Sequence, residues 1–525
     1  MQSQTTPTTC FYASSAWDKL GDKQGTITHD DGSRQPSLLF GPPSPPFWAW
    51  PSWNVGLVSS CGMGFCSGLA IAFAVCCCIL LLSMDAVTGF KKVRGVNLGG
   101  WLVIEGWIKP SLFDDIPNGD MLDGTQVQLK SVLLQKYVSA SNGGGTDVTV
   151  DRDVASSWET FKLWRVSEVE YQFRCYGGQF LTVDTKESLI SSTAWSPDMN
   201  ETFYIERNES RVHIRLLSGN YLQATTESQL TADYRGVPGW DDNEATFEMV
   251  IVSNNLHGDY QLANGLGPDK AKKILRTHRS NFITAEDFGF LFHHGINTVR
   301  IPVGWWIAQD PNPPAPLIGG SLVALDRAFS WAQTYNIRCI IDLHAAPGSQ
   351  NGMEHSASRD GSADWALSSE YISQSLDVIE FLISRYVNHS ALLGIELLNE
   401  PSVSAVPLDV LVSYYMKGYQ IIRRYSSTAY VIICQRIGNA DPVELYQANI
   451  GTSNIVVDLH YYNLFSSLFD NMSAMENIQF LYKSRQSQLQ ALNSANGPLV
   501  FIGRSWNLVL TVVLFSLNAW DFFYC

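Results

Sequence analysis

The sequence predicts an α/β fold, a (β/α)8 TIM barrel lacking its last strand and helix, with an inserted all-β trefoil domain. Apolar runs of strand length alternate with helical patterns along the C-terminal half, which is typical of a parallel sheet covered on both faces. The first such run, near residue 93, is followed by a gap of roughly 200 residues in which a unit of about 42 residues recurs three times. The gap indicates an insertion, and the repeat predicts its three-fold form.

Composition places the chain among folded proteins. It has 525 residues, of which 45% are hydrophobic and 16% charged, and this length suffices for two or three domains. A net charge of −15 without a long basic run argues against a nucleic-acid surface and favours a neutral or cationic ligand. The ten cysteines show neither a disulfide framework nor a zinc spacing, so no metal or other cofactor is expected.

The first 86 residues indicate targeting. Residues 35–84 carry no charge, and the run from Gly68 to Leu82 is almost wholly apolar. We interpret 1–62 as a low-complexity extension, Met63 as the natural start and 63–86 as a signal peptide. An uncleaved signal anchor, with membrane association through residues 55–83, is the alternative. Secretion to the extracellular space or cell wall is expected, with glycosylation at Asn200, Asn208, Asn388 and Asn471.

The repeats lie in residues 131–253. Each contains two aromatic markers in period-two alternation, which predicts short antiparallel strands. The markers are Gln135–Val138, Gly178–Leu181 and Gly219–Leu222, then Glu159–Phe161, Glu201–Phe203 and Ala245–Phe247. The aromatic residues either form the repeated core, which their positions favour, or bind a glycan at the surface of the trefoil.

The barrel is assigned to residues 87–130 and 254–503, on either side of this insertion. Its strands are expected at residues 93–100, 297–303, 338–344, 392–400, 428–436, 454–462 and 498–503. These are one strand short of a closed eight-stranded barrel. Residues 504–525 are interpreted as an aberrant apolar tail, with a membrane helix as the alternative.

Polar side chains stand where the predicted strands end, and in a barrel those ends converge on one face. A single His or Arg at such a place is more often structural, but recurrence at successive strands indicates an active site. The residues are Asn97, Arg300, His344, Asn399, Glu400, His460 and Tyr462.

Five ordered motifs resemble the plant and fungal exo-β-1,3-glucanases of glycoside hydrolase family five, and the repeat is similar to fascin-like domains of the plant subgroup. The motifs are VRGVNLGGWLVIEGWIKPSLF (93–113), VRIPVGWW (299–306), DLHAAPGSQNG (342–352), LLNEP (397–401) and VVDLHYYNLF (456–465). The resemblance implies a retaining glucosidase that takes a β-glucan polysaccharide or oligosaccharide from its non-reducing end.

The resemblance also implies roles for particular residues. Glu400 is the general acid/base, Asn399 holds the sugar 2-hydroxyl and Arg300 is the partner of the nucleophile. The polar shell consists of His344, His460 and Tyr462. Trp305 and Trp306 stack on sugar rings or pack in the loop after their strand.

The nucleophile is absent. Similar enzymes have Gly-Glu-Trp at the end of the seventh strand, where this chain reads Gly503-Arg504-Ser505-Trp506. A retaining enzyme needs a carboxylic acid and a second carboxylate about 5 Å apart. Burial and that second carboxylate are expected to keep Glu400 protonated. Glu396 lies four residues earlier, about 13 Å deeper, and is interpreted as an interior polar residue, while the role of Asp342 is open.

The sequence therefore predicts a glycoside hydrolase by descent whose chain is inactive and, without strand eight, poorly folded. The alternative is a non-catalytic glucan-binding protein. An actin-bundling role, suggested by the fascin resemblance, is disfavoured because a signal sequence removes the protein from the cytoplasm.

Overall fold

The computed structural model describes residues 93–506 except 185, 187, 442, 464–466, 470 and 493–496. The predicted extension, the signal segment and the tail beyond residue 506 lie outside the described residues. In the described part of the chain, no helix has the length and apolar character needed to cross a membrane.

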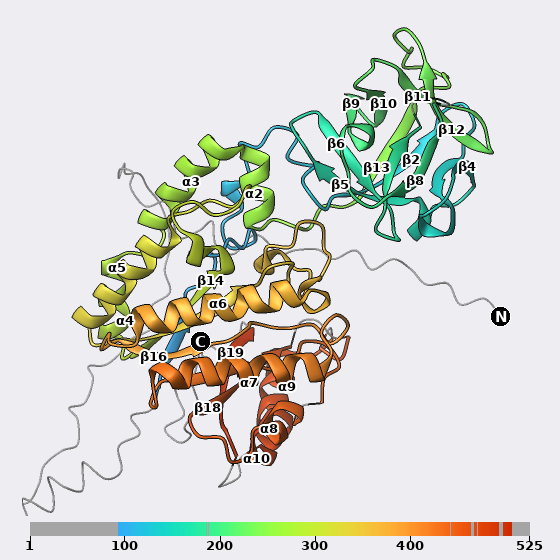
Figure 1. The fold of residues 1–525 in the computed structure, drawn as a ribbon. Helices are drawn as coiled ribbons and strands as arrows, with labels where there is room; N and C mark the ends of the chain where they lie inside the picture. Colours follow the sequence, from blue (N-terminus) through green and yellow to red (C-terminus); the bar gives the residue numbers. More distant parts are fainter. Residues whose placement is uncertain are drawn as a thin grey trace, which may run out of the picture. The chain divides into compact units, whose positions relative to one another are not determined.

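Seven parallel strands form one sheet, in the order β1-β14-β15-β16-β17-β18-β19, which follows the chain (Figure 1). The strands are β1 (Gly95–Asn97), β14 (Thr298–Gly304), β15 (Arg338–Ala345), β16 (Leu392–Glu396), β17 (Tyr430–Cys434), β18 (Ile455–Tyr462) and β19 (Leu499–Trp506). Each overlaps one predicted strand. This order and the helices between the strands make a TIM-barrel-like α/β fold.

Helices connect successive strands of this sheet, and α6 and α7 lie side by side (Figure 1). The α-helices are α2 (Asp259–Leu266), α3 (Pro268–Asn281), α4 (Ala285–His293), α5 (Ser321–Thr334), α6 (Ser369–Tyr386), α7 (Leu408–Tyr425), α8 (Glu444–Ala448), α9 (Ala474–Phe480) and α10 (Gln486–Ala491). Short helical turns are η1 (Pro110–Leu112), η5 (Trp305–Gln309), η6 (Glu354–Ser356), η7 (Trp365–Leu367) and η8 (Leu481–Arg485).

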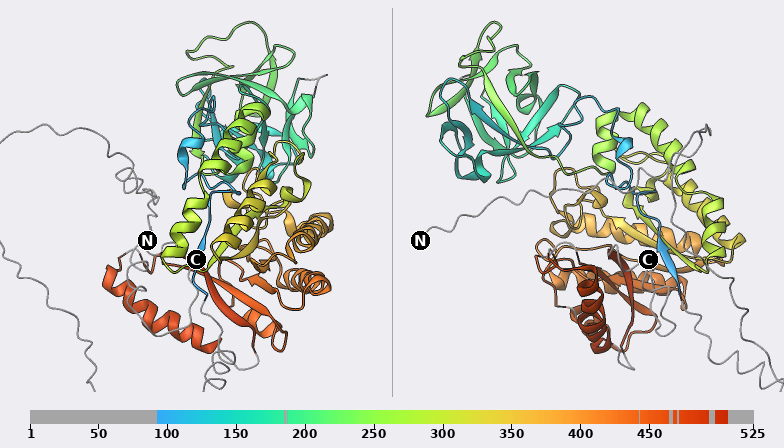
Figure 2. Two further views of the ribbon diagram at one scale, coloured as in Figure 1. Left: turned by 90° about the vertical axis from the view of Figure 1, so that its left-hand side faces the viewer. Right: turned by 180° about the vertical axis from the view of Figure 1, so that it is seen from behind.

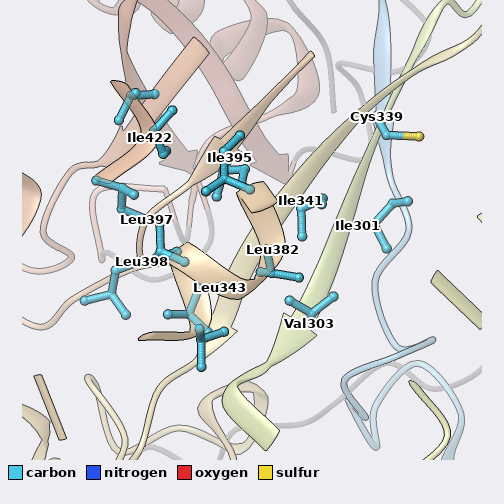
Figure 3. Close-up of a cluster of buried hydrophobic side chains, with 14 of the residues drawn as sticks. Ile301, Val303, Cys339, Ile341, Leu343, Leu382, Ile395, Leu397, Leu398 and Ile422 are labelled. Atoms are coloured by element: carbon cyan, nitrogen blue, oxygen red, sulfur yellow. The ribbon is translucent and has the colours of Figure 1, made fainter. Parts of the chain in front are cut away.

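The largest apolar core lies between the sheet and its helices (Figure 3). Ile341 and Ile395 extend from neighbouring strands, and Leu382 of α6 and Ile422 of α7 pack in the same cluster. All four side chains are fully buried. At roughly 25 cal/mol per Å² of apolar surface, this burial is the main stabilisation of the sheet.

Strand β19 runs through Trp506, three residues beyond the predicted strand end. Its pairing with β18 places Leu459 opposite Ile502 but His460 opposite Arg504, so Gly503 is an extra residue in β19. A Cβ at Gly503 would stand 2.1 Å from Asp458 Oδ2, which makes glycine necessary at this bulge. Arg504 therefore lies in a strand, next to His460.

The insertion, here called the β domain (126–253), is all-antiparallel and contains no α-helix among its described residues (Figure 2). Six strands close a ring, in which β2, β5, β6, β9, β10 and β13 each pair with the next and β13 pairs with β2. Their bounds are β2 (Gln126–Ser131), β5 (Thr160–Arg165), β6 (Glu170–Arg174), β9 (Phe203–Asn208), β10 (Arg211–Leu216) and β13 (Phe247–Ser253). The first strand begins five residues before the predicted start of the insertion.

Three hairpins complete the β domain, and short helical turns precede two of the ring strands. The hairpins are β3 (Tyr137–Ala140) with β4 (Val148–Arg152), β7 (Phe180–Val183) with β8 (Ile190–Ala194), and β11 (Tyr221–Thr226) with β12 (Gln229–Tyr234). The turns are η2 (Ser141–Gly143), η3 (Ser157–Glu159) and η4 (Met199–Glu201).

The repeated aromatic markers form the core of the β domain. Phe161, Phe203 and Phe247 are at most 1% exposed and belong to one apolar cluster. The first two follow a capping box, in which Glu159 and Glu201 accept from the backbone of Ser156 and Asp198. The packing interpretation is therefore correct for these aromatic residues.

Candidate active site

The backbone of the Asn399–Glu400 turn is held in an unusual conformation after β16. Glu400 has φ of 45°, in the left-handed region that side chains rarely adopt, at a cost of about 1–3 kcal/mol. Gln350 donates to the Asn399 carbonyl at 2.8 Å, and Asn351 donates to the Glu400 carbonyl at 3.0 Å. The loop after β15 thereby fixes the direction of the Glu400 side chain.

The Glu400 carboxylate is 3% exposed and meets three polar side chains. His460 Nδ1 lies 2.6 Å from Oε1, and the Tyr462 hydroxyl donates to the same oxygen. His355 Nε2 lies 3.1 Å from Oε2. Strand β18 and the turn η6 therefore converge on the residue that the sequence identified as the general acid/base.

The surroundings of Glu400 favour its charged form. Burial opposes ionisation, but His460 and His355 hold the pKa of this carboxyl well below its usual range. Burial also opposes protonation of His460, whereas Cys434, Asp458 and Glu400 together raise the pKa of the imidazole well above its usual value. The expectation that Glu400 is protonated is wrong for this structure, because its close neighbours are imidazoles and not a carboxylate.

Arg300 organises the layer beneath Glu400 and is fully buried. It donates to Glu396 from Nε at 2.7 Å and from Nη2 at 2.8 Å, and Asp342 lies 3.0 Å from Nη1. Arg300 Nη2 also donates to Asn399 Oδ1 at 2.9 Å. Arg300 Nη1 also donates to Asn97 Oδ1 at 3.0 Å, so the partners of Arg300 are interior carboxylates and the side-chain amides of Asn97 and Asn399.

Glu396 is an interior polar residue, as the sequence indicated, but its carboxylate lies nearer the strand-end cluster than expected. One of its oxygens is within 4.8 Å of a His460 nitrogen. Burial raises the pKa of Glu396 to about 8, and Arg300 opposes this rise. Because Arg300 holds both of its oxygens, Glu396 does not face a substrate.

Asp458 is a carboxylate that contacts β19 directly. It is fully buried, accepts from the Gly503 amide at 2.6 Å and lies 3.1 Å from His460 Nε2. His460 therefore stands between Asp458 and Glu400, with one ring nitrogen toward each. Asp458 orients the imidazole and cannot serve as a nucleophile from behind it.

Glu396, Cys434, Asp458 and His460 place potential metal ligands within 4.8 Å of one another. The donor set does not suit a metal ion, because Arg300 already occupies both oxygens of Glu396. Burial also raises the pKa of the Cys434 thiol to about 12, which disfavours the thiolate that a metal requires.

The structure brings the predicted residues Arg300, His344, Asn399, Glu400, His460 and Tyr462 into one cluster. His344 Nδ1 lies 2.5 Å from Asp342 Oδ2, so both residues support the site from within the sheet. The open role of Asp342 is thus to hold Arg300 and His344.

Trp306 does not stack on sugar, which corrects one of the two interpretations for this residue. Its ring is fully buried and packs with Val103, Leu317 and Ala345. Trp305 is partly buried beside this cluster. Packing in the loop is therefore correct for Trp306.

The sequence interpretation missed His355, Asp458 and Cys434. A signal existed for Asp458, since Asp342-Leu343-His344 and Asp458-Leu459-His460 repeat the same tripeptide on two strands. Residues two apart face the same side of a strand, which places each carboxylate beside its histidine. His355 lies in a long loop, and no local pattern predicted its approach to Glu400.

Carboxylates, imidazoles and one arginine gather at the strand ends of this TIM-barrel-like sheet. Barrel enzymes carry their chemistry on that face, and this chain has the arrangement of that class. The family model described as cellulase (glycosyl hydrolase family 5) matches residues 271–503. A second model, a domain of unknown function (DUF7910), matches residues 118–252.

Curated relatives make the family specific. A glucan 1,3-beta-glucosidase of Pichia angusta is 36% identical over 220 residues, which are 41% of this chain and 50% of the relative. A probable glucan 1,3-beta-glucosidase A of Aspergillus fumigatus is 34% identical over 300 residues, covering 55% of this chain and 69% of the relative. The chain belongs to glycosyl hydrolase family 5. It spans about half the length of the first of these relatives.

Among solved structures, the rutinosidase of Aspergillus niger is 20% identical, with a TM-score of 0.41 over 47% of this chain and 71% of that protein.

Proposed function

We propose that the candidate site receives the non-reducing end of a β-1,3-glucan and that this chain holds the sugar without cleaving it. Hydrolysis with retention is the reaction proposed for a form of this site that carries the missing nucleophilic carboxylate. The names of the curated relatives, glucan 1,3-beta-glucosidase, support the linkage. A non-catalytic glucan-binding role is the consequence for the chain as it stands.

One observation carries this proposal: the chain has Arg504, and not a carboxylate, at the position of β19 that pairs with His460 of β18. Its backbone is in register with His460, whose imidazole contacts Glu400. A retaining mechanism needs a carboxylate there to attack the anomeric carbon. A cationic side chain in its place supplies no nucleophile.

The remaining carboxylates do not compensate. Asp342, Glu396 and Asp458 are fully buried and engaged with Arg300 or with the histidines of the network. Glu400 itself is held ionised, so it has no proton to give to a departing oxygen. Both halves of the retaining mechanism are thus disabled by the same replacement, because the lost carboxylate is also the charge that would raise the pKa of Glu400.

The same site can still bind sugar. An ionised Glu400 is a strong acceptor for sugar hydroxyl groups, and Tyr462 and His355 surround it. Asn399 Nδ2 has no hydrogen-bond partner among the described residues, which suits the proposed contact to a 2-hydroxyl.

Two finer assignments belong to this proposal. The ring of six strands with three hairpins supports a β-trefoil for the β domain. We also propose secretion, with glycosylation at Asn200, Asn208, Asn388 and Asn471, which are all exposed.

Calorimetric titration of the purified chain with laminaribiose, followed by chromatography of the sugar, tests the proposal. We expect saturable binding and intact disaccharide. Glu400→Gln should weaken binding roughly 10-fold, the loss of one hydrogen bond to a charged group. Glu444→Gln, which alters a partly buried glutamate paired with Arg436 elsewhere in the chain, is the matched control. Equal binding by both variants contradicts the assigned site, and glucose in the product contradicts the loss of catalysis.

A further inference from the structure

We propose that a pocket on the β domain, rimmed by Tyr176 and Trp195, binds a segment of an uncharged glucan chain. The pocket has a volume of about 380 Å³, within the range of small-ligand sites. Its lining includes Gln126, Ser157, Lys162, Arg174, Tyr176 and Gly178 of the β domain, together with Ser362 of the loop that follows β15. The site is separate from the Glu400 cluster.

The aromatic residues at this pocket are exposed, unlike those of the repeats. Tyr176 is 71% exposed and Trp195 is 70% exposed. A Cβ at Gly178 would lie 3.6 Å from the Trp195 ring, so Trp195 borders the turn that lines the pocket. A Cβ at Gly143 would likewise lie 3.2 Å from ring atoms of Trp158 and of Tyr176. Three aromatic rings therefore surround two glycine turns.

Comparison of the three hairpins shows that this feature is not part of the repeat. Tyr137, Phe180 and Tyr221 occupy the same register position, opposite Arg152, Ala194 and Tyr234. Leu133, Tyr176 and Leu217 stand four residues before the first set, one in each hairpin. Asp153, Trp195 and Arg235 stand one residue after the partners, again one in each hairpin.

Only the middle hairpin, β7–β8, carries aromatic side chains at both of these exposed positions. Core packing accounts for residues that all three repeats share, but Tyr176 and Trp195 are unshared and exposed. A ligand accounts for both features, because exposed aromatic rings at a concave surface are typical of binding sites.

The charges at the pocket leave a site for an uncharged ligand. Arg174 Nη1 lies 2.5 Å from Asp360 Oδ2. Burial alone would raise the pKa of Asp360, but Arg174 and Lys162 outweigh burial and lower this pKa to about 2. Asp364 also lies in the field of Arg174 and Lys162, so the two carboxyl groups balance the two cations. An acidic polysaccharide would need an excess of positive charge that this balance does not provide.

Glucan rings present apolar C–H faces and a rim of hydroxyl groups. The faces suit Tyr176 and Trp195, and the hydroxyls suit the amide of Gln126 and the hydroxyl of Ser157. Gln179 is 9% exposed, and its Oε1 has no hydrogen-bond partner in the described residues. This oxygen lies against the glycine turn, because a Cβ at Gly177 would be 2.6 Å from it. The choice of β-1,3-glucan as the chain rests on the proposed function.

Electrophoresis of the full chain in native gels containing laminarin, cellulose-derived hydroxyethylcellulose or polygalacturonate tests the inference. We expect laminarin to retard the wild type, and we expect Asn399→Ala, which removes a contact of the barrel site, to lose only the part of the retardation that the barrel site contributes. Tyr176→Ala and Trp195→Ala should each reduce the retardation at least 5-fold, with unchanged melting temperature because both side chains are exposed. Leu217→Ala and Arg235→Ala, at the equivalent positions of the third hairpin, are the matched controls and should migrate as the wild type does.

The outcomes separate this inference from the proposed function. Loss of retardation in Asn399→Ala alone assigns glucan binding to the barrel and overturns the β-domain site. Undiminished retardation of Tyr176→Ala and Trp195→Ala overturns it as well, as does retardation by polygalacturonate only. Retardation by hydroxyethylcellulose in place of laminarin keeps the pocket as a neutral-glucan site and contradicts only the β-1,3 linkage.

Discussion

The centre of the parallel sheet and the centre of the β domain differ in what they bury. In the sheet, Arg300, Asp342, Glu396 and Asp458 are fully enclosed at the strand ends. The β domain instead buries one large apolar cluster, with Phe203 among its fully buried side chains, and its buried Glu159 caps a turn. The sheet therefore depends on a balance of buried charges, and a single replacement such as Arg504 alters its chemistry. The β domain tolerates surface variation, so new properties arise on one hairpin without disturbing the others.

The largest effect is expected from restoring the missing carboxylate. Arg504→Glu places a carboxylate in register with His460, supplies a nucleophile and raises the pKa of Glu400 by like-charge repulsion. Release of glucose from laminarin should rise by on the order of 10³-fold or more. Arg504→Gln removes the cation without adding a nucleophile and is the control. Equal rates for the two variants would show that the carboxylate is not what the site lacks.

Removal of the central cation tests the balance of buried charges. Arg300→Met leaves Glu396 and Asp342 without their ion pairs and should lower the free energy of unfolding by about 3–5 kcal/mol. Arg385→Met breaks an ion pair to Asp326 whose partners are 40% and 39% exposed, and should cost about 0–1 kcal/mol. Urea denaturation followed by circular dichroism measures both. Similar losses for the two variants would contradict the contrast between buried and exposed pairs.

A smaller effect is expected from a polar group in the β domain. Glu159 accepts from Ser139 Oγ at 2.6 Å and from the Ser156 amide at 2.7 Å. Glu159→Ala leaves these donors without an acceptor and should cost about 1–3 kcal/mol in denaturant titration. The third repeat already has Ala245 at this position. Glu227→Ala, at an exposed glutamate, is the control, and a loss as large as that of Glu159→Ala would refute the role of the capping box.

The smallest effect, counted per pH unit, is a pH dependence of stability. The pKa of His460 is raised in the folded chain, so its contribution is complete below the unfolded pKa of about 6.5 and is lost as pH rises through the folded pKa. In that window the free energy of unfolding should fall by about 1.4 kcal/mol per pH unit.

Melting temperatures of the wild type, His460→Gln and His293→Gln between pH 6 and pH 9 check this expectation. His460→Gln should flatten the curve, whereas His293, which is exposed, should not affect it. A curve for His460→Gln as steep as that of the wild type assigns the dependence to other groups.

The fold was largely predictable because its signals are local. Apolar strands and polar residues at their ends recur along the chain, and all seven predicted strands are present in sequence order. The spacing of Phe161, Phe203 and Phe247 likewise predicted a repeated core, since equivalent positions of a repeat are buried alike.

Local patterns failed where the site depends on three-dimensional encounters. The approach of His355 to Glu400 joins a loop turn to a strand end. The ionised state of Glu400 follows from the imidazoles around it and not from its own motif. The burial of Trp306 depends on side chains from three separate segments. Such contacts are set by the whole fold, which no single motif encodes.

The most direct test of the central claim is the release of glucose from laminarin by the purified 525-residue chain. With Arg504 in β19 and Glu400 held ionised by His460, we expect no release above the buffer blank over hours, while laminaribiose still binds. Release at a rate typical of glycosidases, about 1 per second or faster, would contradict the account, because it would require a nucleophile that this arrangement does not provide.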